Sequence, residues 1–290
     1  MEQKDYPGLY RAADNASISA QSAYLRSVKW HIFTLILGAL LAINPLPNAI
    51  YSLINASVFL AALGISIFIA SKRYERAWYS ARAVAESVKT ATWRYIMRAE
   101  PFLDANSVHE VNAVFRDMLR DILSSNNQIG DLLGGDDCAN EQITPEMQSI
   151  RARDIEDRKN FYLSARIDEQ RKWYAKKSKH NKKRSSQFFA LLVVLQATAI
   201  ALVLSRIAFP EWKIWPTEVF VVAAGAVTTW IQLKRFQEIA TAYALTAHEI
   251  GIIRTKLDEV NSNELFSDFV RDAENAFSRE HTQWIAKVEK

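Results

Sequence analysis

The stretch FFALLVVLQATAIALVLS, Phe188–Ser205, contains no charged residue. A run of about 18 apolar residues forms roughly 27 Å of α-helix, which is close to the thickness of the hydrocarbon core of a bilayer. The basic run KKSKHNKKR, Lys176–Arg184, precedes it, and the loop RIAFPEWKIWP, Arg206–Pro216, follows it. A second apolar run, Val219–Leu233, ends at the pair Lys234-Arg235. Two apolar runs joined by a short loop with proline predict a transmembrane helical hairpin.

The N-terminal half of the chain has the same layout. Lys29 leads into WHIFTLILGALLAIN, Trp30–Asn44, and two prolines directly after this run end it. A further apolar run, Ala49–Ala70, is followed by Ser71 and the pair Lys72-Arg73. The sequence therefore predicts four transmembrane helices in two hairpins, which form a coarse internal repeat.

Basic residues lie at the open ends of both predicted hairpins and not at the short outer loops. Lys and Arg accumulate on the cytoplasmic side of membrane proteins. We therefore expect an inner-membrane protein whose two short loops face outward and whose termini and central connector are cytoplasmic. The residues expected to form a basic collar at the membrane are Lys72, Arg73, Lys182, Lys183, Arg184, Lys234 and Arg235.

The composition agrees with a few apolar spans carried on charged helices. The chain has 290 residues and a net charge of +4, and 49% of its residues are hydrophobic. Its positive charges cluster beside apolar runs, which favours anionic lipid over nucleic acid as the acidic partner. A single cysteine, Cys138, excludes an internal disulfide bond and a cysteine-based zinc site.

The distribution of helix breakers predicts an all-α protein with long helical extensions outside the membrane. Thr144-Pro145 is typical of a helix start, with a capping hydroxyl before a proline at the first helical position. No proline follows until Pro210. One helix from Pro145 to Phe209 would be roughly 95 Å long at about 1.5 Å per residue, and only its last third would lie in the membrane.

Apolar stripes on the C-terminal helices indicate that these extensions pack against one another. The stripes consist of Ile250, Ile253, Leu257 and Val260, and of Phe266, Phe269, Val270, Ala273 and Phe277. A segment rich in Gly, Ser, Asn and Asp, from Ser124 to Gln142, indicates a flexible linker. We therefore expect an N-terminal membrane module at 1–124, a linker at 125–142 and a C-terminal membrane module at 143–290.

Small and polar residues inside the predicted spans allow two interpretations. They permit close packing of helices, with Gln196 hydrogen-bonded across helices, or they form the wall of an oligomeric pore. No span carries a charge, which argues against a proton-coupled pump or transporter. The candidate residues for packing or for a pore are Ala61, Gly64, Gln196, Ala224, Gly225 and Thr228.

The segment after the second span has a polar helical face with Arg82 and Glu86 at i,i+4 spacing. It is either a solvated helix with ordinary ion pairs or a cytoplasmic contact surface that controls assembly or signal input. The candidates for such a regulatory surface are Trp78, Arg82, Glu86 and Trp93.

No motif supports catalysis, a cofactor or a metal ion. Gly134-Gly135-Asp136-Asp137 is similar to a nucleotide-cyclase motif, but no strands flank it, so we interpret it as part of the linker. The chain has no phosphate-binding glycine-rich loop and no nucleophile elbow. Five scattered histidines lack partners at the spacing of metal ligands: His31, His109, His180, His248 and His281.

Four segments give the chain a resemblance to a known family. They are YPGLYRAADNASISAQSAYL at Tyr6–Leu25, the pattern W–R–AE–K–WRY at Trp78–Tyr95, RIDEQRKWYAKKSKHN at Arg166–Asn181, and SREHTQW at Ser278–Trp284. Together they resemble the SLATT family, the prokaryotic two-helix membrane effector domains associated with SMODS nucleotidyltransferases and SLOG sensors. The resemblance covers nearly the whole chain as two SLATT-like modules in tandem.

The resemblance implies an effector that oligomerises and forms a pore in the inner membrane. It also implies a role in anti-phage or related conflict systems, a nucleotide-linked trigger, and a sensor or synthase encoded nearby. The alternative is a non-conducting membrane scaffold that anchors a cytoplasmic partner. We expect no enzyme activity, no cofactor, no metal and no nucleic-acid partner, and we expect a homo-oligomer in the lipid bilayer.

Overall fold

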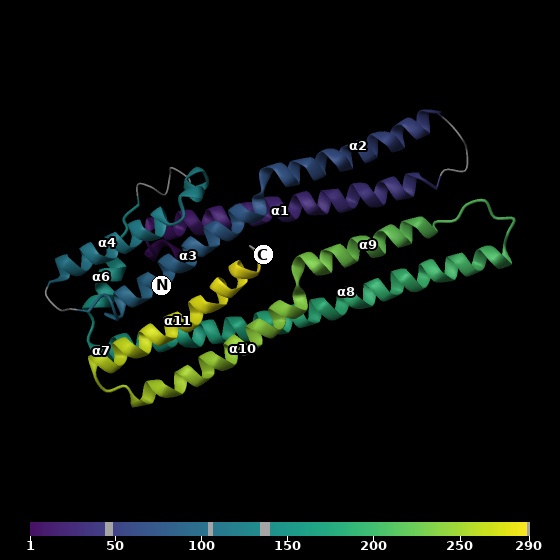
Figure 1. The fold of residues 1–290 in the computed structure, drawn as a ribbon. Helices are drawn as coiled ribbons and strands as arrows, with labels where there is room; N and C mark the ends of the chain where they lie inside the picture. Colours follow the sequence, from purple (N-terminus) through teal and green to yellow (C-terminus); the bar gives the residue numbers. More distant parts are fainter. Residues whose placement is uncertain (44–48, 104–106, 134–139, 289–290) are drawn as a thin grey trace. The chain divides into compact units, whose positions relative to one another are not determined.

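The computed structural model describes residues 1–43, 49–103, 107–133 and 140–288, and it contains helices and no strands in these ranges. Figure 1 shows the fold. The elements are η1 (Gln3–Asp5), α1 (Gly8–Leu41), α2 (Ala49–Lys72), α3 (Tyr74–Ile96), α4 (Val108–Ser124), η2 (Asn127–Leu132), α6 (Pro145–Ala152), α7 (Ile155–Tyr162), the π-helical turn η3 (Leu163–Asp168), α8 (Glu169–Ala208), α9 (Thr217–Lys234), α10 (Phe236–Thr255), η4 (Lys256–Glu259) and α11 (Asn263–Val288). The predicted all-α fold class is confirmed.

The chain folds into two compact units, each built from both halves of the sequence. The hairpin unit consists of Ser22–Tyr74 and Ser178–Thr241. The core unit consists of Met1–Gln21, Glu75–Lys177 and Ala242–Lys290. Helices α1 and α8 each contribute residues to both units.

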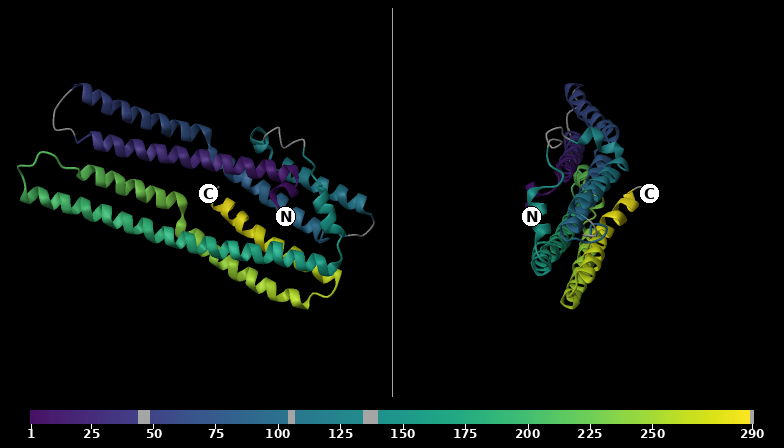
Figure 2. Two further views of the ribbon diagram at one scale, coloured as in Figure 1. Left: turned by 180° about the vertical axis from the view of Figure 1, so that it is seen from behind. Right: turned by 90° about the vertical axis from the view of Figure 1, so that its left-hand side faces the viewer.

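The hairpin unit contains the apolar helices. Within it α1 lies beside α2, and α8 lies beside α9 (Figure 1, Figure 2). Among the described residues, two helices are long and apolar enough to cross a membrane, Ala49–Ile96, read through the single break at Arg73, and Ile155–Ala208. Only 6% of the most apolar 18 residues of each helix is buried, whereas the core helix of a soluble protein is mostly buried. Both helices therefore fit a membrane span by length and composition, and the other two expected spans, in α1 and α9, stay predictions.

Both hairpins end in the same backbone turn. The sequences Ile69-Ala-Ser-Lys-Arg-Tyr and Ile231-Gln-Leu-Lys-Arg-Phe match at the end of α2 and of α9. Arg73 and Arg235 both adopt the left-handed conformation, with φ of 46° and 44°. Each arginine N–H donates to the carbonyl of the isoleucine four residues earlier, at 3.3 Å and 2.9 Å. This conformation is unfavourable for residues other than glycine, so its occurrence at both sites shows that α2 and α9 end in the same type of turn.

The expectation of one continuous helix from Pro145 to Phe209 is wrong. The helix begins as predicted, because the Thr144 hydroxyl accepts from the Met147 N–H at 3.3 Å and Pro145 takes the first position. It breaks at Arg153, whose backbone is extended. Asp154 then caps a new helix by accepting from the Asp157 N–H at 2.8 Å. A capping carboxylate satisfies an N–H that a continuous helix would have bonded to its own backbone, and so it favours a new start.

The segment expected to be a flexible linker is partly packed. Asn127–Leu132 forms a 3-10 helix, and Ile129 is fully buried in the core. Gly134-Gly135-Asp136-Asp137 and Cys138 lie outside the described residues, as do the prolines expected to turn the first hairpin. The described part of this segment therefore belongs to the core unit.

The core unit buries the apolar stripes predicted on its C-terminal helices. Eight of the nine stripe residues are buried, and Ile253 packs against them partly exposed. The alanine- and valine-rich face of α3 lies in the same core, with Ala81, Val84, Ala85 and Val88 fully buried. Small side chains on α3 let its neighbours approach the backbone closely, and this fixes where the larger polar groups of the core can lie.

One close approach inside the first hairpin gives a test of its packing. A Cβ atom added to Gly38 of α1 would lie 2.9 Å from the Phe59 ring of α2, whereas one added to Gly64 would meet nothing within 4 Å. We expect Gly38→Leu to lower the free energy of unfolding by about 1–3 kcal/mol through overpacking. Gly64→Ala is the matched control and should be neutral or stabilising, because alanine favours helix. Thermal unfolding in detergent compares the two, and equal unfolding temperatures would contradict the packing.

Candidate functional site

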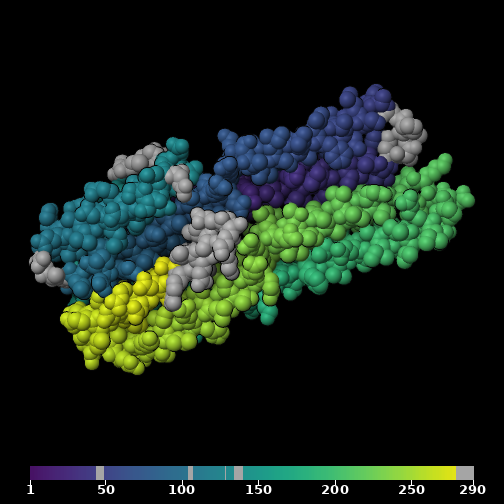
Figure 3. Space-filling view, in the orientation of Figure 1, coloured from purple at the N-terminus to yellow at the C-terminus, as the bar shows by residue number. Residues whose placement is uncertain are grey.

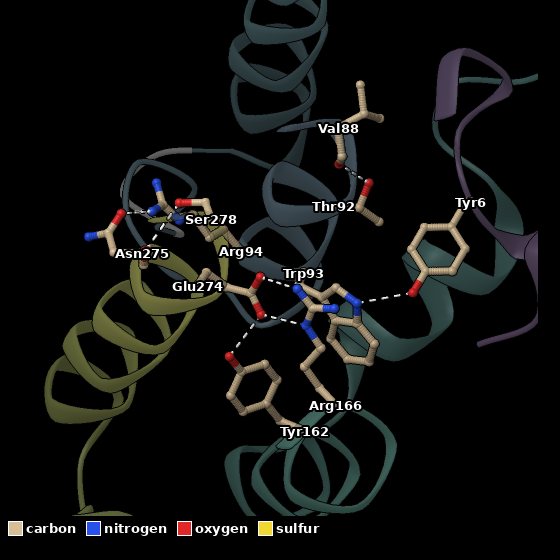
Figure 4. Close-up of polar contacts among 10 residues, drawn as sticks. All are labelled: Tyr6, Val88, Thr92, Trp93, Arg94, Tyr162, Arg166, Glu274, Asn275 and Ser278. Carbon is tan, nitrogen blue, oxygen red and sulfur yellow. Dashed lines mark hydrogen bonds and ion pairs between the residues drawn. The ribbon is translucent and has the colours of Figure 1, made fainter. Parts of the chain in front are cut away.

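A buried ion pair lies at the centre of the core unit (Figure 4). Arg166 donates from Nε to Glu274 Oε1 at 2.9 Å and from Nη2 to Glu274 Oε2 at 2.6 Å. Their side chains are 3% and 0% exposed. Two parallel hydrogen bonds of this kind fix the guanidinium and the carboxylate in one plane. The pair joins the η3 turn to α11.

Tyr162 completes the coordination of the carboxylate. Its hydroxyl donates to Glu274 Oε1 at 2.9 Å. Burial, followed by the charge of Glu274, raises the pKa of the Tyr162 phenol well above its ordinary value. Burial alone would lower the pKa of the Arg166 guanidinium, but Glu274 more than offsets this and raises it. The phenol is therefore neutral and the guanidinium charged over the accessible pH range, and the network is a fixed structural element.

Trp93 connects this ion pair to the N-terminus of the chain. Its indole Nε1–H donates to the Tyr6 hydroxyl at 3.0 Å in a buried setting. The Arg166 guanidinium lies over the Trp93 ring at 5.6 Å, a cation–π distance. The Tyr162 ring meets the indole edge-on, with centroids 5.7 Å apart. One indole thus contacts residues from two distant stretches of sequence.

Arg166 lies in a π-helical turn. Leu163–Asp168 carries one wide helical turn between α7 and α8. A π turn inserts an extra residue and shifts the face that the following side chains present, and such turns are frequent at functional sites. Arg166 and Ile167 are both buried in this turn.

Two further arginines bind the end of α3. Arg158 donates to the Met97 carbonyl at 2.6 Å, and Arg151 donates to the carbonyls of Tyr95 and Phe102, the latter at 2.8 Å. The last carbonyls of a helix lack partners within the helix, and cations there are favourable. Sequence analysis did not single out Arg151 or Arg158, because solvated arginines are common on helices and nothing local marks them as buried.

The four candidates for a regulatory surface differ in burial, and the surface itself stays a prediction. Arg82 bonds to Asp14 at 3.2 Å and to Glu86 at 2.5 Å, so the predicted Arg82–Glu86 pair is present and has a third member from α1. Trp78 is half-buried and stacks on Tyr79 at 4.7 Å. Trp93 is 1% exposed, so the prediction of a contact surface is wrong for this residue. It is buried because its ring fills the space beneath the Arg166 guanidinium.

A small polar cavity lies beside the buried network. Its volume is about 210 Å³, and its lining includes Tyr10, Asp14, Lys89, Arg166 and Glu169. Burial lowers the pKa of the Lys89 ammonium. Among the residues that the structure describes, no cluster of three metal-binding side chains occurs. The cavity holds both acids and bases and is smaller than usual ligand sites, so it does not define a ligand.

The candidates in the spans fall on different faces of their helices. Ala61, Gly64, Gln196 and Gly225 are exposed, and Ala224 is buried. Thr228 is half-buried and donates to the Ala224 carbonyl at 3.0 Å. The structure does not bring these residues together at one site. Sequence analysis missed Gly38, which makes the close approach to Phe59, and Asn55, whose side-chain oxygen is buried with no partner among the described residues.

The predicted basic collar is largely exposed. Lys72, Arg73, Lys182, Lys183 and Arg184 are exposed, whereas Lys234 and Arg235 are half-buried. Exposed Lys and Arg at the ends of apolar helices suit the headgroup region of a bilayer.

Family comparison assigns the two halves of the chain. Residues 7–159 match SMODS and SLOG-associating 2TM effector domain 3, and residues 162–284 match SMODS and SLOG-associating 2TM effector domain 1. The chain belongs to the SLATT family. Its domains are effector domains of anti-phage and conflict systems and are not known as catalytic. No protein of curated function and no solved structure matches the chain.

The two SLATT domains share one core. Trp93 belongs to the first matched range, and Tyr162, Arg166 and Glu274 belong to the second. The matched ranges meet between residues 159 and 162, just before the η3 turn. The contacts of Trp93 with Arg166 and Tyr162 therefore join the tandem domains, and the proposed boundary at 125–142 stays a prediction.

Removing one partner of the ion pair should destabilise the core unit strongly. Glu274→Gln keeps the shape of the side chain but leaves the Arg166 charge buried without a counterion, which costs about 3–5 kcal/mol. The double variant R166M/E274L should recover part of this loss, because an apolar pair needs no counterion. Arg271→Gln, which breaks exposed ion pairs, is the control and should leave the unfolding temperature nearly unchanged. Thermal unfolding of purified protein measures all three, and an unchanged E274Q would contradict the role of the pair.

The stability that the Tyr6 hydroxyl contributes through its contact with Trp93 should fall at alkaline pH. Burial raises the pKa of Tyr6 to about 12 from 10.0. The neutral phenol is favoured in the folded state, so its contribution is complete below pH 10 and is lost as pH rises toward 12. A shift of this size is worth roughly 2 to 3 kcal/mol. The difference in unfolding temperature between the natural protein and Tyr6→Phe should therefore narrow from pH 9 to pH 12, and a constant difference would refute it.

Proposed function

We propose that this SLATT protein is an inner-membrane effector that oligomerises and permeabilises the membrane in an anti-phage or related conflict system. In this proposal four helices cross the membrane in two hairpins, and the termini are cytoplasmic. The exposed basic collar supports this orientation through the positive-inside rule. Two long helices, Ala49–Ile96 and Ile155–Ala208, each contain an apolar stretch that is almost wholly exposed within one chain. This exposure supports burial of these stretches in lipid and against other copies of the chain.

The observation that carries the proposal is the lack of a hydrogen-bond partner for the Gln196 side chain. This amide is exposed in the middle of the apolar part of α8, and it has no hydrogen-bond partner among the described residues. The hydroxyls of Thr198, Thr228 and Thr229 differ, because each donates to a carbonyl one turn earlier in its own helix. An amide in hydrocarbon gains from a hydrogen bond across helices. A second copy of the chain is the nearest source of such a partner.

Small residues on exposed faces fit the same assembly. Ala61, Gly64 and Gly225 leave open surface on α2 and α9, and Figure 3 shows side chains of these helices at the outside of the molecule. Nothing lies within 4 Å of a Cβ atom added to Gly64 or Gly225. Small residues let helices of neighbouring copies approach closely. A ring of copies can enclose a polar path that four uncharged helices of one chain cannot.

The core unit is the proposed site of control. The buried contacts of Trp93, Arg166 and Glu274 join both SLATT domains. In this proposal a change in their packing is passed to the hairpins through α8, which continues directly from the η3 turn. The cavity beside this network is smaller than a nucleotide site, at about 210 Å³. We therefore propose that a nucleotide-linked signal arrives through a sensor or synthase encoded nearby, without a cofactor.

Replacing Gln196 should separate a pore from a scaffold. We expect Gln196→Leu to reduce oligomer formation about tenfold or less, because one hydrogen bond between helices contributes about 0.6–1.7 kcal/mol. Leakage of a trapped dye from liposomes at high protein density should fall in parallel. Gln232→Leu, which changes an exposed amide at the end of α9, is the matched control and should leave both unchanged.

The outcomes distinguish the two candidate functions. Tight liposomes at every protein density, together with killing of cells that produce the protein, would refute the pore and support the scaffold. Leakage by a protein that stays monomeric would refute the oligomer.

A further inference from the structure

The hairpin unit contains a large apolar groove between its two hairpins. Its volume is about 700 Å³, and residues of α1, α8 and α9 line it together with Phe236 at the start of α10. The walls are mainly aliphatic, and at one end Phe188 and Phe236 stack with centroids 5.3 Å apart. The aliphatic wall residues are Ile32, Ile36, Leu191, Leu195 and Val227. A groove of this size can hold a drug-sized ligand or part of a lipid.

Four basic side chains belong to the same groove. Lys29 comes from α1, His180 and Arg184 from α8, and Lys234 from α9. No acidic residue lines the groove. Within the described part of the chain, none of the four forms an ion pair. Cations from three helices thus converge without a counterion from the protein.

Trp230 shows how closely two of these charges approach. The Lys29 ammonium lies 5.8 Å from the centre of its indole ring, and the Lys234 ammonium lies 5.9 Å from the same centre. An indole attracts a cation, but it cannot neutralise two. Tryptophan is also typical of the headgroup level of a bilayer. The basic end of the groove is therefore placed where a lipid headgroup would lie.

We propose that this groove binds one anionic glycerophospholipid of the cytoplasmic leaflet. Its phosphate lies among Lys29, Arg184 and Lys234, and its acyl chains lie along the aliphatic wall. Charge complementarity selects the headgroup, because the groove presents cations and no acid. Basic pockets between transmembrane helices are known to bind anionic headgroups in this way.

The proposal makes the lipid a contact between the hairpins. Lys29 and Ile32 belong to the first hairpin, whereas Arg184, Leu191 and Lys234 belong to the second. An anionic lipid would relieve repulsion among cations that otherwise face one another across the groove. This inference does not depend on pore formation, since a scaffold would hold the lipid equally well.

Native mass spectrometry of the full-length protein tests the site directly. The protein is delipidated in detergent and titrated with phosphatidylglycerol or with phosphatidylcholine of the same acyl composition. We expect one phosphatidylglycerol to bind at least tenfold more tightly than phosphatidylcholine. The double variant K29Q/K234Q should lose about tenfold in affinity for phosphatidylglycerol, since each basic residue near the surface contributes to anionic lipid binding.

The control variant K182Q/K183Q removes the same charge from exposed residues that do not line the groove. It should bind phosphatidylglycerol as the natural protein does, and equal losses in the two double variants would reduce the effect to net charge and overturn the site. Equal binding of the two lipids would overturn it as well. Full competition by glycerol phosphate would show a plain anion site, without a role for the acyl chains.

A second variant tests the apolar part of the groove. Ala226→Trp fills the wall with a large side chain and should displace the lipid while leaving Lys29, Arg184 and Lys234 in place. Thermal unfolding in detergent confirms that this variant is folded. Cysteines introduced at Ile36 and Leu191 in a C138A background test the other possible occupant of the groove, a helix of a second copy. Disulfide formation between copies at these positions would show that such a helix fills the groove, and would overturn the proposal of a bound lipid.

Discussion

The buried pair of Arg166 and Glu274 constrains how the rest of the core unit can be built. Two charges removed from water are tolerated only when both are present and their hydrogen-bonding groups are satisfied. Tyr162 supplies a hydroxyl to the carboxylate, and Trp93 supplies an aromatic face to the guanidinium. The polar contacts of this network leave no freedom to place α3, η3 or α11 independently. The tandem SLATT domains therefore form one core.

Tyr162 and Arg166 reach the same carboxylate from one helical segment. They are four residues apart, and residues four apart on a helix lie on the same face, so both side chains meet Glu274. The turn that carries Arg166, Leu163–Asp168, is π-helical. The segment continues as α8, whose C-terminal part belongs to the hairpin unit.

The hairpin unit has the opposite physical character. Its helices are held by few specific contacts inside one chain, such as the approach of Gly38 to Phe59 and the stacking of Phe188 on Phe236. Most of its apolar surface is open, and polar atoms such as the Gln196 amide have no partner among the described residues. Lipid and further copies of the chain are the partners that such a surface can take.

The sequence by itself determined the periodicity and the composition of this protein. Uncharged runs, prolines, the Thr144 cap and the basic ends of the hairpins act over a few residues, so the all-α fold, the helix starts and the tandem repeat could be predicted. The stripes that include Ile250 and Phe266 could be predicted for the same reason. Only the tertiary structure decided that Arg166 meets Glu274, 108 residues away, and that Trp93 is buried beneath it. It also decided that Lys29, Arg184 and Lys234 line one apolar groove. Pairing between distant residues depends on how helices pack in space, and no local pattern in a single sequence encodes that packing.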